Sequence, residues 1–504
     1  MTDCDVLICG LGPVGQLLAL LLGDLGVRTI AVEEALQPYN LPRAAVIDDE
    51  VLRIFQAVGL DEQVLADAQV QRTVTFLTSR GRRIEAFRTQ HGELGHPPLV
   101  SIHQPSMERT MVAALEQRGA VELRWGHRVE IVDRAAEHVT AWLRPVGGGR
   151  AEPLTARYLV GCDGARSAVR GRLQVPFGGF TFVQRWLVVD ALVDRPLAKV
   201  PHPHFVGDTQ RPIVTLPMSP GRHRWEWMLH PGEDPAPLLE PARIRELIAP
   251  WTVDEQVEVE RAVVYTFHAR TAARWRAGRV LLAGDAAHVM PPFVGQGFSS
   301  GARDAGNLAW KLDAVLHGAP PRLLDSYETE RRPHVTSMQK LAVRWGGVVQ
   351  TTHQGVGMIR DGTLELLDRT GALRRISDNA KPLPTYRAGA FASRPHPLPF
   401  RRTVGSLFPQ PGRLDERLGR GWSAVCRSRR AADTWREQGL RAVELEREAW
   451  LDRHQLDWVL LRPDRYVFAC GSDDQLSAAL QALRATVGVG LRTERAQTTM
   501  AVAA

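Results

Sequence analysis

A glycine motif within the first fifteen residues constrains the fold of this chain more than any other feature. The apolar run at residues 5–9 is typical of a buried parallel strand, and Gly10-Leu-Gly-Pro-Val-Gly15 follows it directly. Gly10 permits a tight turn, Gly12 lets a pyrophosphate approach the backbone, and Gly15 lets the next helix pack closely on the strand. The motif predicts a dinucleotide-binding unit of strand, helix and strand.

The residues after the motif continue the same pattern. Residues 16–26 are typical of an apolar helix, whose free N-terminal N–H groups and partial positive charge favour phosphate binding. A second strand is expected at residues 28–32. It ends at Glu33, 18 positions after Gly15, where a carboxylate can hold the hydroxyl groups of a ribose. This order predicts that the ADP part of a dinucleotide binds here, and it leaves open whether the ligand is FAD or NAD.

Two later motifs combine a strand with a sharp polar turn. Apolar strands are expected at residues 158–162 and 280–283, and they end in Asp163-Gly164 and Gly284-Asp285. Taken singly, Asp and Gly at these places could simply form turns. In an open parallel sheet, however, ligands bind beyond the carboxyl ends of the strands, so we expect both turns to border one crevice with the glycine motif.

Together these motifs resemble those of the class A flavoprotein aromatic hydroxylases, which have the para-hydroxybenzoate hydroxylase fold. The resemblance rests on "GLGPVG" with Glu33, on "CDGARSAVR" and on "GDAAHVMPPFVGQG". Residues 41–60, 185–190, 297–312 and 323–334 are most similar to the 3-(3-hydroxyphenyl)propionate hydroxylase branch. The similarity covers residues 3–340 and becomes weaker beyond them.

The resemblance implies an α/β fold of three parts. A Rossmann-like βαβ domain that binds FAD is interleaved with an antiparallel-sheet domain that binds the substrate, and a small thioredoxin-like α/β domain follows at the C-terminus. The expected ranges are 1–70, 100–175 and 270–345 for the FAD-binding domain, 71–99 and 176–269 for the substrate-binding sheet domain, 346–411 for a helical and proline-rich connector, and 412–504 for the C-terminal domain.

The C-terminal domain is expected to be structural. In it we predict strands at 421–426, 456–461 and 465–470, and helices at 434–451 and 473–487. The five cysteines of the chain include no Cys-x-x-Cys pair, so dithiol redox chemistry is not expected there. Homodimer formation is a second role that we consider for this domain.

The resemblance also implies the cofactors, which are FAD, bound without a covalent link, and NADH or NADPH as co-substrate. In the family, residues that match Asp285 and Gln104 contact the ribityl region, one that matches Arg43 lies beside the flavin, and the Asp163-Gly164 pair serves the pyrophosphate and NAD(P)H. The full set of expected cofactor-binding residues is Gly10, Gly12, Pro13, Val14, Gly15, Glu33, Glu34, Arg43, Gln104, Asp163, Gly164, Gly284, Asp285, Pro292, Gly295, Gln296 and Gly297.

The loop at residues 284–297 has a composition that suits a flat ring system. Pro291-Pro292 rigidifies the loop, Gly295-Gln296-Gly297 can bring bare backbone against a ring, and a helix is expected from residue 299 to 318. At the N-terminus of this helix, the dipole and the free amide groups would stabilise negative charge on the pyrimidine side of a reduced flavin.

The resemblance implies a monooxygenase reaction. In this family reduced flavin and O₂ form a C4a-hydroperoxyflavin, which transfers one oxygen atom to a phenolic aromatic substrate. The phenol has to lose its proton at least in part, from an ordinary pKa of about 10. The carbonyl of Pro292 matches the family's acceptor of the substrate hydroxyl, and Asp48 or Asp49 is a candidate for direct assistance. The alternative is that both acidic residues cap the helix that follows them.

The expected substrate is an aromatic acid similar to 3-(3-hydroxyphenyl)propionate. Phe298, however, stands where that branch often has methionine, which keeps open a polycyclic or polyketide-derived phenol, and also Baeyer–Villiger or epoxidation chemistry. A flavin-binding protein without turnover is a further alternative, and the "CDGARSAVR" motif argues against it. Candidates for contact with the aromatic ring, which are also candidates for the core, are Trp186, Trp225, Trp227, Tyr265 and Phe267.

Composition and charge argue against several other classes. The net charge of +7 comes from arginines scattered along the chain, without a basic block or a nucleic-acid motif. The apolar run that begins at Leu17 is interrupted by Gly23 and Asp24, too soon for a membrane span. The cysteines have no zinc spacing, and a strand that starts at Asp5 leaves no room for a signal peptide. We therefore expect a cytoplasmic enzyme that takes a small aromatic substrate and O₂ and binds neither nucleic acid, nor a membrane, nor a metal.

Overall fold

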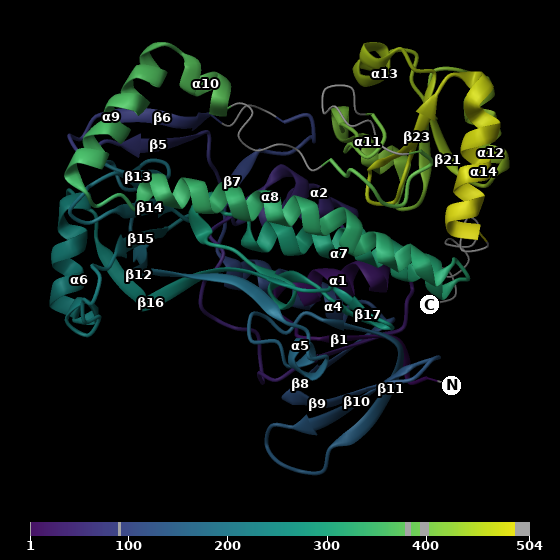
Figure 1. Cartoon of the computed structure of the whole chain (residues 1–504), viewed down its shortest axis with the longest axis horizontal. Helices are drawn as coiled ribbons and strands as arrows, with labels where there is room; N and C mark the ends of the chain where they lie inside the picture. The colour runs from purple at the N-terminus through teal and green to yellow at the C-terminus, as the bar shows by residue number, and fades with distance from the viewer. Residues whose placement is uncertain (1, 89–91, 378–384, 394–402, 489–504) are drawn as a thin grey trace.

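A parallel sheet carries the glycine motif (Figure 1). The computed structural model describes residues 2–88, 92–377, 385–393 and 403–488. In it β1 (Cys4–Cys9) pairs in parallel with β2 (Thr29–Glu33) and with β11 (Glu152–Gly161). β8 (Val121–Trp125) and β18 (Val280–Leu282) extend the sheet in parallel on either side. The apolar side chains of β1 are buried, as expected for a parallel sheet that is covered on both faces.

Two helices bring the first and the last sequence motif together. α1 (Pro13–Asp24) follows the glycine motif, and α7 (Gly297–Leu316) follows the loop at 284–297. The two helices pack against each other so closely that a side chain on Gly301 would overlap Val14. The other helices of this half of the molecule are α2 (Asp49–Ala57), α3 (Asp61–Ala66), α4 (Gln104–Glu116), α5 (Ala168–Arg172) and α8 (Asp325–Val349).

A second, mainly antiparallel sheet forms the other large layer. Its strand order is β19-β16-β12-β15-β14-β13-β5-β6. β12 and β16 are its longest strands, and their apolar side chains pack with α6 into a separate core. The bounds are β5 (Thr73–Leu77), β6 (Arg83–Arg88), β12 (Phe177–Val193), β13 (His204–Val206), β14 (Ile213–Pro217), β15 (Arg222–Met228), β16 (Val257–Ala272) and β19 (His288–Val289).

Shorter elements connect these layers. β3 (Val46–Asp48), β7 (Leu99–Ser101) and β4 (Gln69–Val70) form a small sheet, and β9 (His127–Arg134), β10 (Val139–Pro145) and β17 (Arg276–Ala277) extend the edges of the parallel sheet. The remaining helices before the C-terminal domain are α6 (Pro241–Ile248), α9 (Gln354–Arg369) and α10 (Ala372–Ser377), with 3-10 turns at Pro237–Leu239, Ala249–Trp251 and Pro321–Leu324.

The C-terminal domain has the strand and helix order of a thioredoxin-like fold. Its sheet order is β21-β20-β22-β23, with the first pair parallel and the others antiparallel. In Figure 1 the domain lies in yellow at the upper right, above the right-hand part of α7 and α8. The bounds are η7 (Pro411–Arg413), α11 (Leu414–Leu418), β20 (Ser423–Cys426), α12 (Arg429–Glu437), β21 (Arg441–Glu444), α13 (Ala449–His454), β22 (Trp458–Leu461), β23 (Val467–Gly471), η8 (Asp473–Gln475) and α14 (Leu476–Val487). This arrangement confirms the expected fold class.

One predicted helix in this domain is wrong. Residues 434–451 were expected to form a single helix, but α12 ends at Glu437 and the chain turns at Gly439, whose φ is 76°. Arg441–Glu444 then forms β21, which pairs in parallel with β20, and α13 starts only at Ala449. Pairing with a neighbouring strand overrides the helical preference of these residues. Most of the proline-rich part of the expected connector lies outside the described residues.

Buried ion pairs attach the C-terminal domain to the rest of the molecule. Arg53 of α2 binds Asp415 through two hydrogen bonds of 2.6 and 2.8 Å. Arg462 binds Glu330 of α8 through two hydrogen bonds of 2.9 Å each, and Lys311 of α7 lies 2.9 Å from the same carboxylate. Because almost all of these groups are hidden from water, the domain is fixed in a defined position against α2, α7 and α8.

The described residues contain no helix with the length and apolar character needed to cross a bilayer. Over the same part of the chain, no group of three or more His, Cys, Asp or Glu side chains is arranged to hold a metal ion.

Candidate active site

A long cavity of about 1270 Å³ runs from the carboxyl end of the parallel sheet to the face of the second sheet. Sites for single small molecules measure roughly 300–1,000 Å³, so this cavity has room for a dinucleotide together with a second ligand. The sharp turns after β1, β11 and β18 all border it, through Gly10, Asp163 and Asp285. The expectation that the three motifs meet at one crevice is therefore correct.

The glycine motif shapes one end of the cavity. Gly10 has a φ of 103°, and a side chain there would overlap the backbone of Cys162 at the end of β11. Gly15 does not line the cavity: a side chain on it would overlap the carbonyl oxygen of Gly10, so it serves the packing of α1 on β1. The carboxylate of Glu33 accepts a hydrogen bond of 2.8 Å from the N–H of Leu11, which fixes it beside the motif. This end is formed by the same elements that hold the ADP part of a dinucleotide in Rossmann-like folds.

Several features of the cavity fit FAD. A Cβ atom on Gly12 or Gly297 would meet no protein atom within 4 Å, so a side chain there would occupy ligand space. Asp163 Oδ1 is buried and has no hydrogen-bond partner among the described residues, although Oδ2 accepts from the N–H of Val169 at 3.0 Å. The side chain of Asp285 faces the cavity and likewise makes no hydrogen bond within the described part of the chain. These open positions suit a ligand that is rich in hydroxyl groups and has a flat ring.

The surroundings of the two aspartates shift their pKa values. Burial raises the pKa of Asp163, against the effect of its hydrogen bonds with Ser167 and the nearby backbone. Burial also raises the pKa of Asp285, while the charges of His288 and Arg43 act in the opposite direction. A hydrogen bond from a bound hydroxyl group to either carboxyl would favour its charged form.

A hydrogen-bonded network anchors the segment that holds Arg43. Gln104 Oε1 accepts from the N–H groups of Arg43 and Ala44 at 3.3 and 2.6 Å, and its Nε2 donates to Glu108 at 2.6 Å. Gln16 of α1 donates to the other oxygen of Glu108 at 3.2 Å. Burial raises the pKa of Glu108 to about 7, although the hydrogen bond from Gln104 opposes the shift. Gln104, predicted from the resemblance, therefore lines the cavity and also holds the Arg43 segment in place.

The loop at 284–297 crosses from one sheet to the other. After η3 (Gly284–Ala286), residues His288 and Val289 form β19 and pair with β16 of the second sheet. The 3-10 turn η4 (Pro292–Val294) is followed by Gly295, whose φ is 61° and where an added Cβ would overlap Val46. α7 begins at Gly297, two residues earlier than expected, and Gly297 borders the cavity. The free N–H groups at the start of α7 therefore lie at the ligand space.

Asp48 and Asp49, the two candidates for direct assistance to the substrate, have different positions. Asp48 is buried, caps α2 by accepting from the N–H of Val51 at 3.1 Å, and binds Arg303 at 2.6 Å. It does not line the cavity, so for Asp48 the helix-cap interpretation is favoured. Asp49 does line the cavity, at the first turn of α2. Of the two carboxylates, Asp49 is the one placed to meet a ligand.

A buried network connects Asp48 to the loop and to the C-terminal domain. Arg303 of α7 also donates to Glu50 at 2.5 Å and to Gln296 at 2.9 Å, and Gln296 donates to Asp48 at 3.0 Å. The hydroxyl of Tyr466, in the C-terminal domain, donates to Glu50 at 3.0 Å. The N-terminal turn of α7 is thus held by contacts from α2 and from the C-terminal domain.

Apolar side chains line the half of the cavity that faces the second sheet. The aromatic residues expected there do not reach it, because Trp186, Trp225, Trp227, Tyr265 and Phe267 are absent from its lining, and the three tryptophans are buried in the core. The side chains that do line this half are Val74, Phe87, Phe205, Val214, Leu216, Met290, Phe293, Met338, Leu341 and Trp345. These walls come from separate elements, and only the folded chain brings them together.

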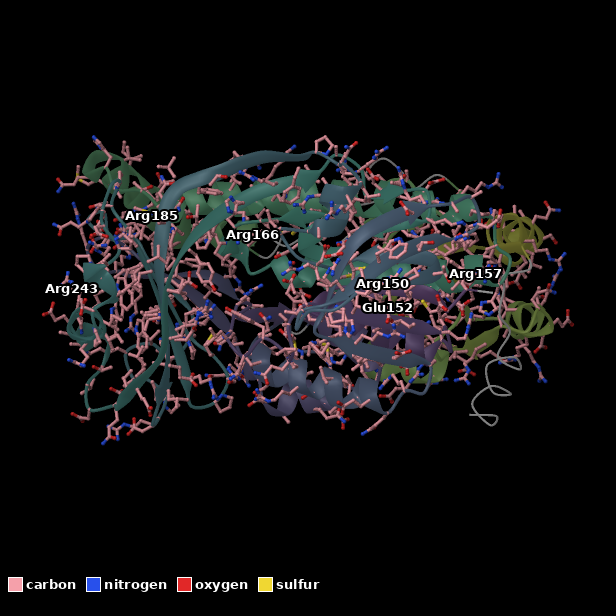
Figure 2. The ribbon with its side chains drawn as sticks, turned by 90° about the horizontal axis from the view of Figure 1, so that it is seen from below. Arg150, Glu152, Arg157, Arg166, Arg185 and Arg243 are labelled. Atoms are coloured by element: carbon pink, nitrogen blue, oxygen red, sulfur yellow. The ribbon has the colours of Figure 1, made fainter. Side chains whose placement is uncertain are left out.

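Four charged residues that line the cavity were not expected from the sequence. Arg128 and Arg166 border the dinucleotide end, while Arg224 and Glu226 border the other half. In Figure 2, Arg166 lies near the middle of the molecule, between Arg185 on one side and Arg150 and Arg157 on the other. Arg166 belongs to the "CDGARSAVR" motif, which was a signal for it, but nothing in the sequence distinguishes Glu226 from other strand residues.

Of the residues expected to bind the cofactor, most line the cavity. Gly15 and Gly284 do not, since both serve close packing, with Gly284 against Val14. Those that do are Gly10, Gly12, Pro13, Val14, Glu33, Glu34, Arg43, Gln104, Asp163, Gly164, Asp285, Pro292, Gly295, Gln296 and Gly297.

Comparisons with known proteins agree with this geometry. Residues 3–342 match the family model of the FAD binding domain, and residues 443–486 match that of the HcaD C-terminal domain. The chain is 37% identical to a 3-(3-hydroxy-phenyl)propionate/3-hydroxycinnamic acid hydroxylase of Mycobacterium sp. (strain JLS), over 92% of this chain and 89% of the relative.

Solved structures are similar over nearly the whole chain. The flavin-dependent monooxygenase PieE, solved with FAD and substrate, has a TM-score of 0.81 at 21% identity and covers 97% of this chain and 100% of its own. The anhydrotetracycline hydroxylase OxyS from Streptomyces rimosus has a TM-score of 0.76 at 26% identity, covering 96% and 99%.

Proposed function

The chain belongs to the FAD binding domain family as an FAD-dependent aromatic hydroxylase, and from this premise we propose that it hydroxylates a phenolic acid similar to 3-(3-hydroxyphenyl)propionate. NADH or NADPH is the electron donor in this proposal, and O₂ is the source of the oxygen atom. The main support for the proposal is the continuous cavity. One end of it fits FAD, and its apolar half is large enough for an aromatic ring. The names of the relatives support the choice of acid.

FAD, when bound, supplies the redox chemistry through which O₂ is activated and one oxygen atom reaches the ring. We assign its ADP part to the glycine motif and Glu33, its ribityl chain to Asp285, and its ring to the segment from Gly295 to Gly297. The DG pair, Asp163 and Gly164, is assigned to the pyrophosphate and to the approach of NAD(P)H. The apolar walls of the other half exclude water around the reacting ring.

The protein also has to help the phenol lose its proton. Pro292 borders the cavity, and its carbonyl oxygen is the proposed acceptor of the hydrogen bond from the substrate hydroxyl. Asp49 is the second proposed acceptor, because its carboxylate lines the cavity at the start of α2. A well-placed acceptor of this kind contributes about 10²–10⁴-fold to the rate.

A panel of phenols tests the substrate class. We expect 3-(3-hydroxyphenyl)propionate and 3-hydroxycinnamate to stimulate NAD(P)H oxidation and to give products that are heavier by one oxygen atom. A polycyclic phenol is the second candidate, because the cavity is large and OxyS, a similar structure, is an anhydrotetracycline hydroxylase. If only the polycyclic phenol is hydroxylated, the proposed acid is wrong.

Two further properties complete the proposal. We propose a cytoplasmic location, because the proposed electron donor is NAD(P)H. The C-terminal domain is the part to which we assign a homodimer contact, which light scattering on the purified protein would test.

A further inference from the structure

Glu226 lies in the mostly apolar half of the cavity, beside the charged side chain of Arg224. It is two residues after Arg224 on β15, so both side chains point to the same side of the sheet, and both line the cavity. Only 8% of Glu226 is exposed. The residues paired with it on the two neighbouring strands, Val188 and Val214, are apolar.

The charged groups around Glu226 are largely occupied with one another. Arg224 binds Asp190 at 2.6 and 3.1 Å and donates to the carbonyls of Pro42 and Arg43. Its distance to Glu226 is 3.9 Å, which is an ion pair without a hydrogen bond. No hydrogen bond to the carboxyl of Glu226 is found within the described residues, so this group is available to a ligand in the cavity.

Two more groups from β16 complete this cluster. Arg261 lies 3.8 Å from Asp190 and also contacts the hydroxyl of Tyr265. Burial raises the pKa of Glu226 to about 7, against the lowering effect of Arg224, and Asp190 adds to the rise. With Glu226 protonated, the two guanidinium groups face the single charge of Asp190, which leaves one positive charge in excess. An anionic ligand would balance this charge.

We propose that Glu226 binds the carboxylate of the phenolic acid, by donating its carboxyl proton to that carboxylate beside Arg224. The inference rests on the proposed function, because it explains how an acidic tail is recognised in a cavity half that is mostly apolar. The proposal also gives Glu226 a role in specificity. While its carboxyl group is protonated, Glu226 favours the binding of an acid over that of a neutral phenol.

The sign of the pH dependence follows from this arrangement. The substrate carboxyl has an ordinary pKa of about 4, so it is ionised throughout the range of interest. Below pH 7 Glu226 is protonated and binds the anion, and above it the ionised group repels the anion. The Kd of the acid should therefore rise by up to about tenfold per pH unit above pH 7. The Kd of the corresponding neutral amide should stay constant.

Binding to the oxidised, FAD-containing enzyme tests this directly, because ligand binding near the flavin changes its absorbance without turnover. The probes are 3-(3-hydroxyphenyl)propionate and its amide, between pH 6 and 9. Glu226→Gln keeps the shape and a hydrogen-bond donor that does not titrate, so it should bind the acid with little pH dependence. At pH 8.5 it should bind the acid up to about 30-fold more tightly than the unaltered protein does. Glu226→Leu should lose the preference for the acid.

The matched control is Glu258→Gln, which removes an exposed carboxylate from β16 of the same sheet. It should retain the pH profile of the unaltered protein. An acid Kd that does not rise above pH 7, or that falls, overturns the role of Glu226, as does a Glu226→Gln profile equal to that of the unaltered protein. Failure of the proposed function looks different, because then no phenol of the panel stimulates NAD(P)H oxidation at any pH.

Discussion

Asp48 and Asp49 are neighbours in the sequence, yet their side chains have different surroundings. Asp48 is held by Arg303 and by the backbone of α2, whereas Asp49 borders the cavity. The sequence places both in the same short stretch and does not separate them. The difference arises from α7, which lies far away in the chain and brings Arg303 to one carboxylate only.

The two aspartates should therefore respond differently to substitution. Asp49→Asn should reduce hydroxylated product by up to about 10²-fold while NAD(P)H oxidation continues and H₂O₂ is released, because the proposed proton acceptor is lost. Asp48→Asn should instead lower the thermal stability, because it leaves Arg303 with one fewer buried partner. Product, peroxide and melting temperature, measured on both variants, separate the roles. Full coupling in Asp49→Asn would leave the carbonyl of Pro292 as the activating group.

Asp285 should contribute to FAD affinity. Asp285→Ala removes a carboxylate that faces the cavity, and a charge-assisted hydrogen bond is worth about 1.5–3 kcal/mol, or roughly 10–150-fold in Kd. Flavin content after dialysis and a fluorescence titration of the apoprotein measure the loss, with Asp285→Asn as the control that keeps an oxygen acceptor. Unchanged affinity in the alanine variant would contradict the assignment.

At the level of the elements, the position of α7 depends on a network that no local pattern reveals. Gly297 begins the helix at the cavity, and Arg303, six residues later, binds Asp48, Glu50 and Gln296. The outermost member is Tyr466, which lies between β22 and β23 of the C-terminal domain and donates to Glu50. The C-terminal domain thus supports the start of α7 through Glu50.

Tyr466→Phe tests this support. Loss of a hydrogen bond to a buried carboxylate costs about 1.5–3 kcal/mol, so the variant should melt at a lower temperature. It should also show faster hydrogen exchange in the first turns of α7 and at Gln296. Tyr158→Phe is the matched control, since Tyr158 is a buried tyrosine of β11 outside this network. Equal exchange in both variants would show that Tyr466 does not hold α7.

The helices and strands also show which structural features local sequence patterns can predict. The strand and helix around the glycine motif and the turns at Asp163 and Asp285 follow from local sequence, and the structure has all of them, with α1 starting at Pro13, three residues earlier than expected. The helix predicted over residues 434–451 failed, because strand pairing with β20 decides the conformation of Arg441–Glu444. Glu108 and Glu226 were missed because tertiary packing alone places them at the cavity.

For the whole molecule, the order of the motifs along the chain determines the architecture of the two interleaved sheets. The attachment of the C-terminal domain depends instead on charged residues that come together only when the chain folds. The carboxylate of Glu330, on α8, receives Arg462 of the C-terminal domain and Lys311 of α7. Burial alone would raise the pKa of Glu330, but these charges lower it to about 2. Burial would likewise raise the pKa of Asp415, but the charges of Arg53 and Arg465 lower it to about 2.

The lowered pKa values of Glu330 and Asp415 predict how the attachment of the C-terminal domain depends on pH. Their pKa values are lowered in the folded state, so their contribution to stability is complete above the ordinary value of about 4 and decreases as the pH falls towards 2. The C-terminal domain should therefore remain docked at pH 5 and come loose progressively below pH 4. Hydrogen exchange of β22 and β23 and limited proteolysis at several pH values measure this. A Glu330→Gln variant should lose part of the attachment at neutral pH, and loosening of the unaltered protein between pH 7 and 5 would contradict the assignment.

The coupling of electron donor to product tests the central claim, that this molecule is a hydroxylase in which one cavity holds both FAD and a phenolic acid. NAD(P)H consumption, H₂O₂ and hydroxylated product are measured together, with 3-(3-hydroxyphenyl)propionate and with a mimic that lacks the phenolic hydroxyl. The account predicts that the phenol raises NAD(P)H consumption well above the rate without ligand and yields one product, heavier by one oxygen atom, for each NAD(P)H consumed. The mimic should yield peroxide in place of product. Consumption that no phenol stimulates, or peroxide without product for every phenol tested, would contradict the account.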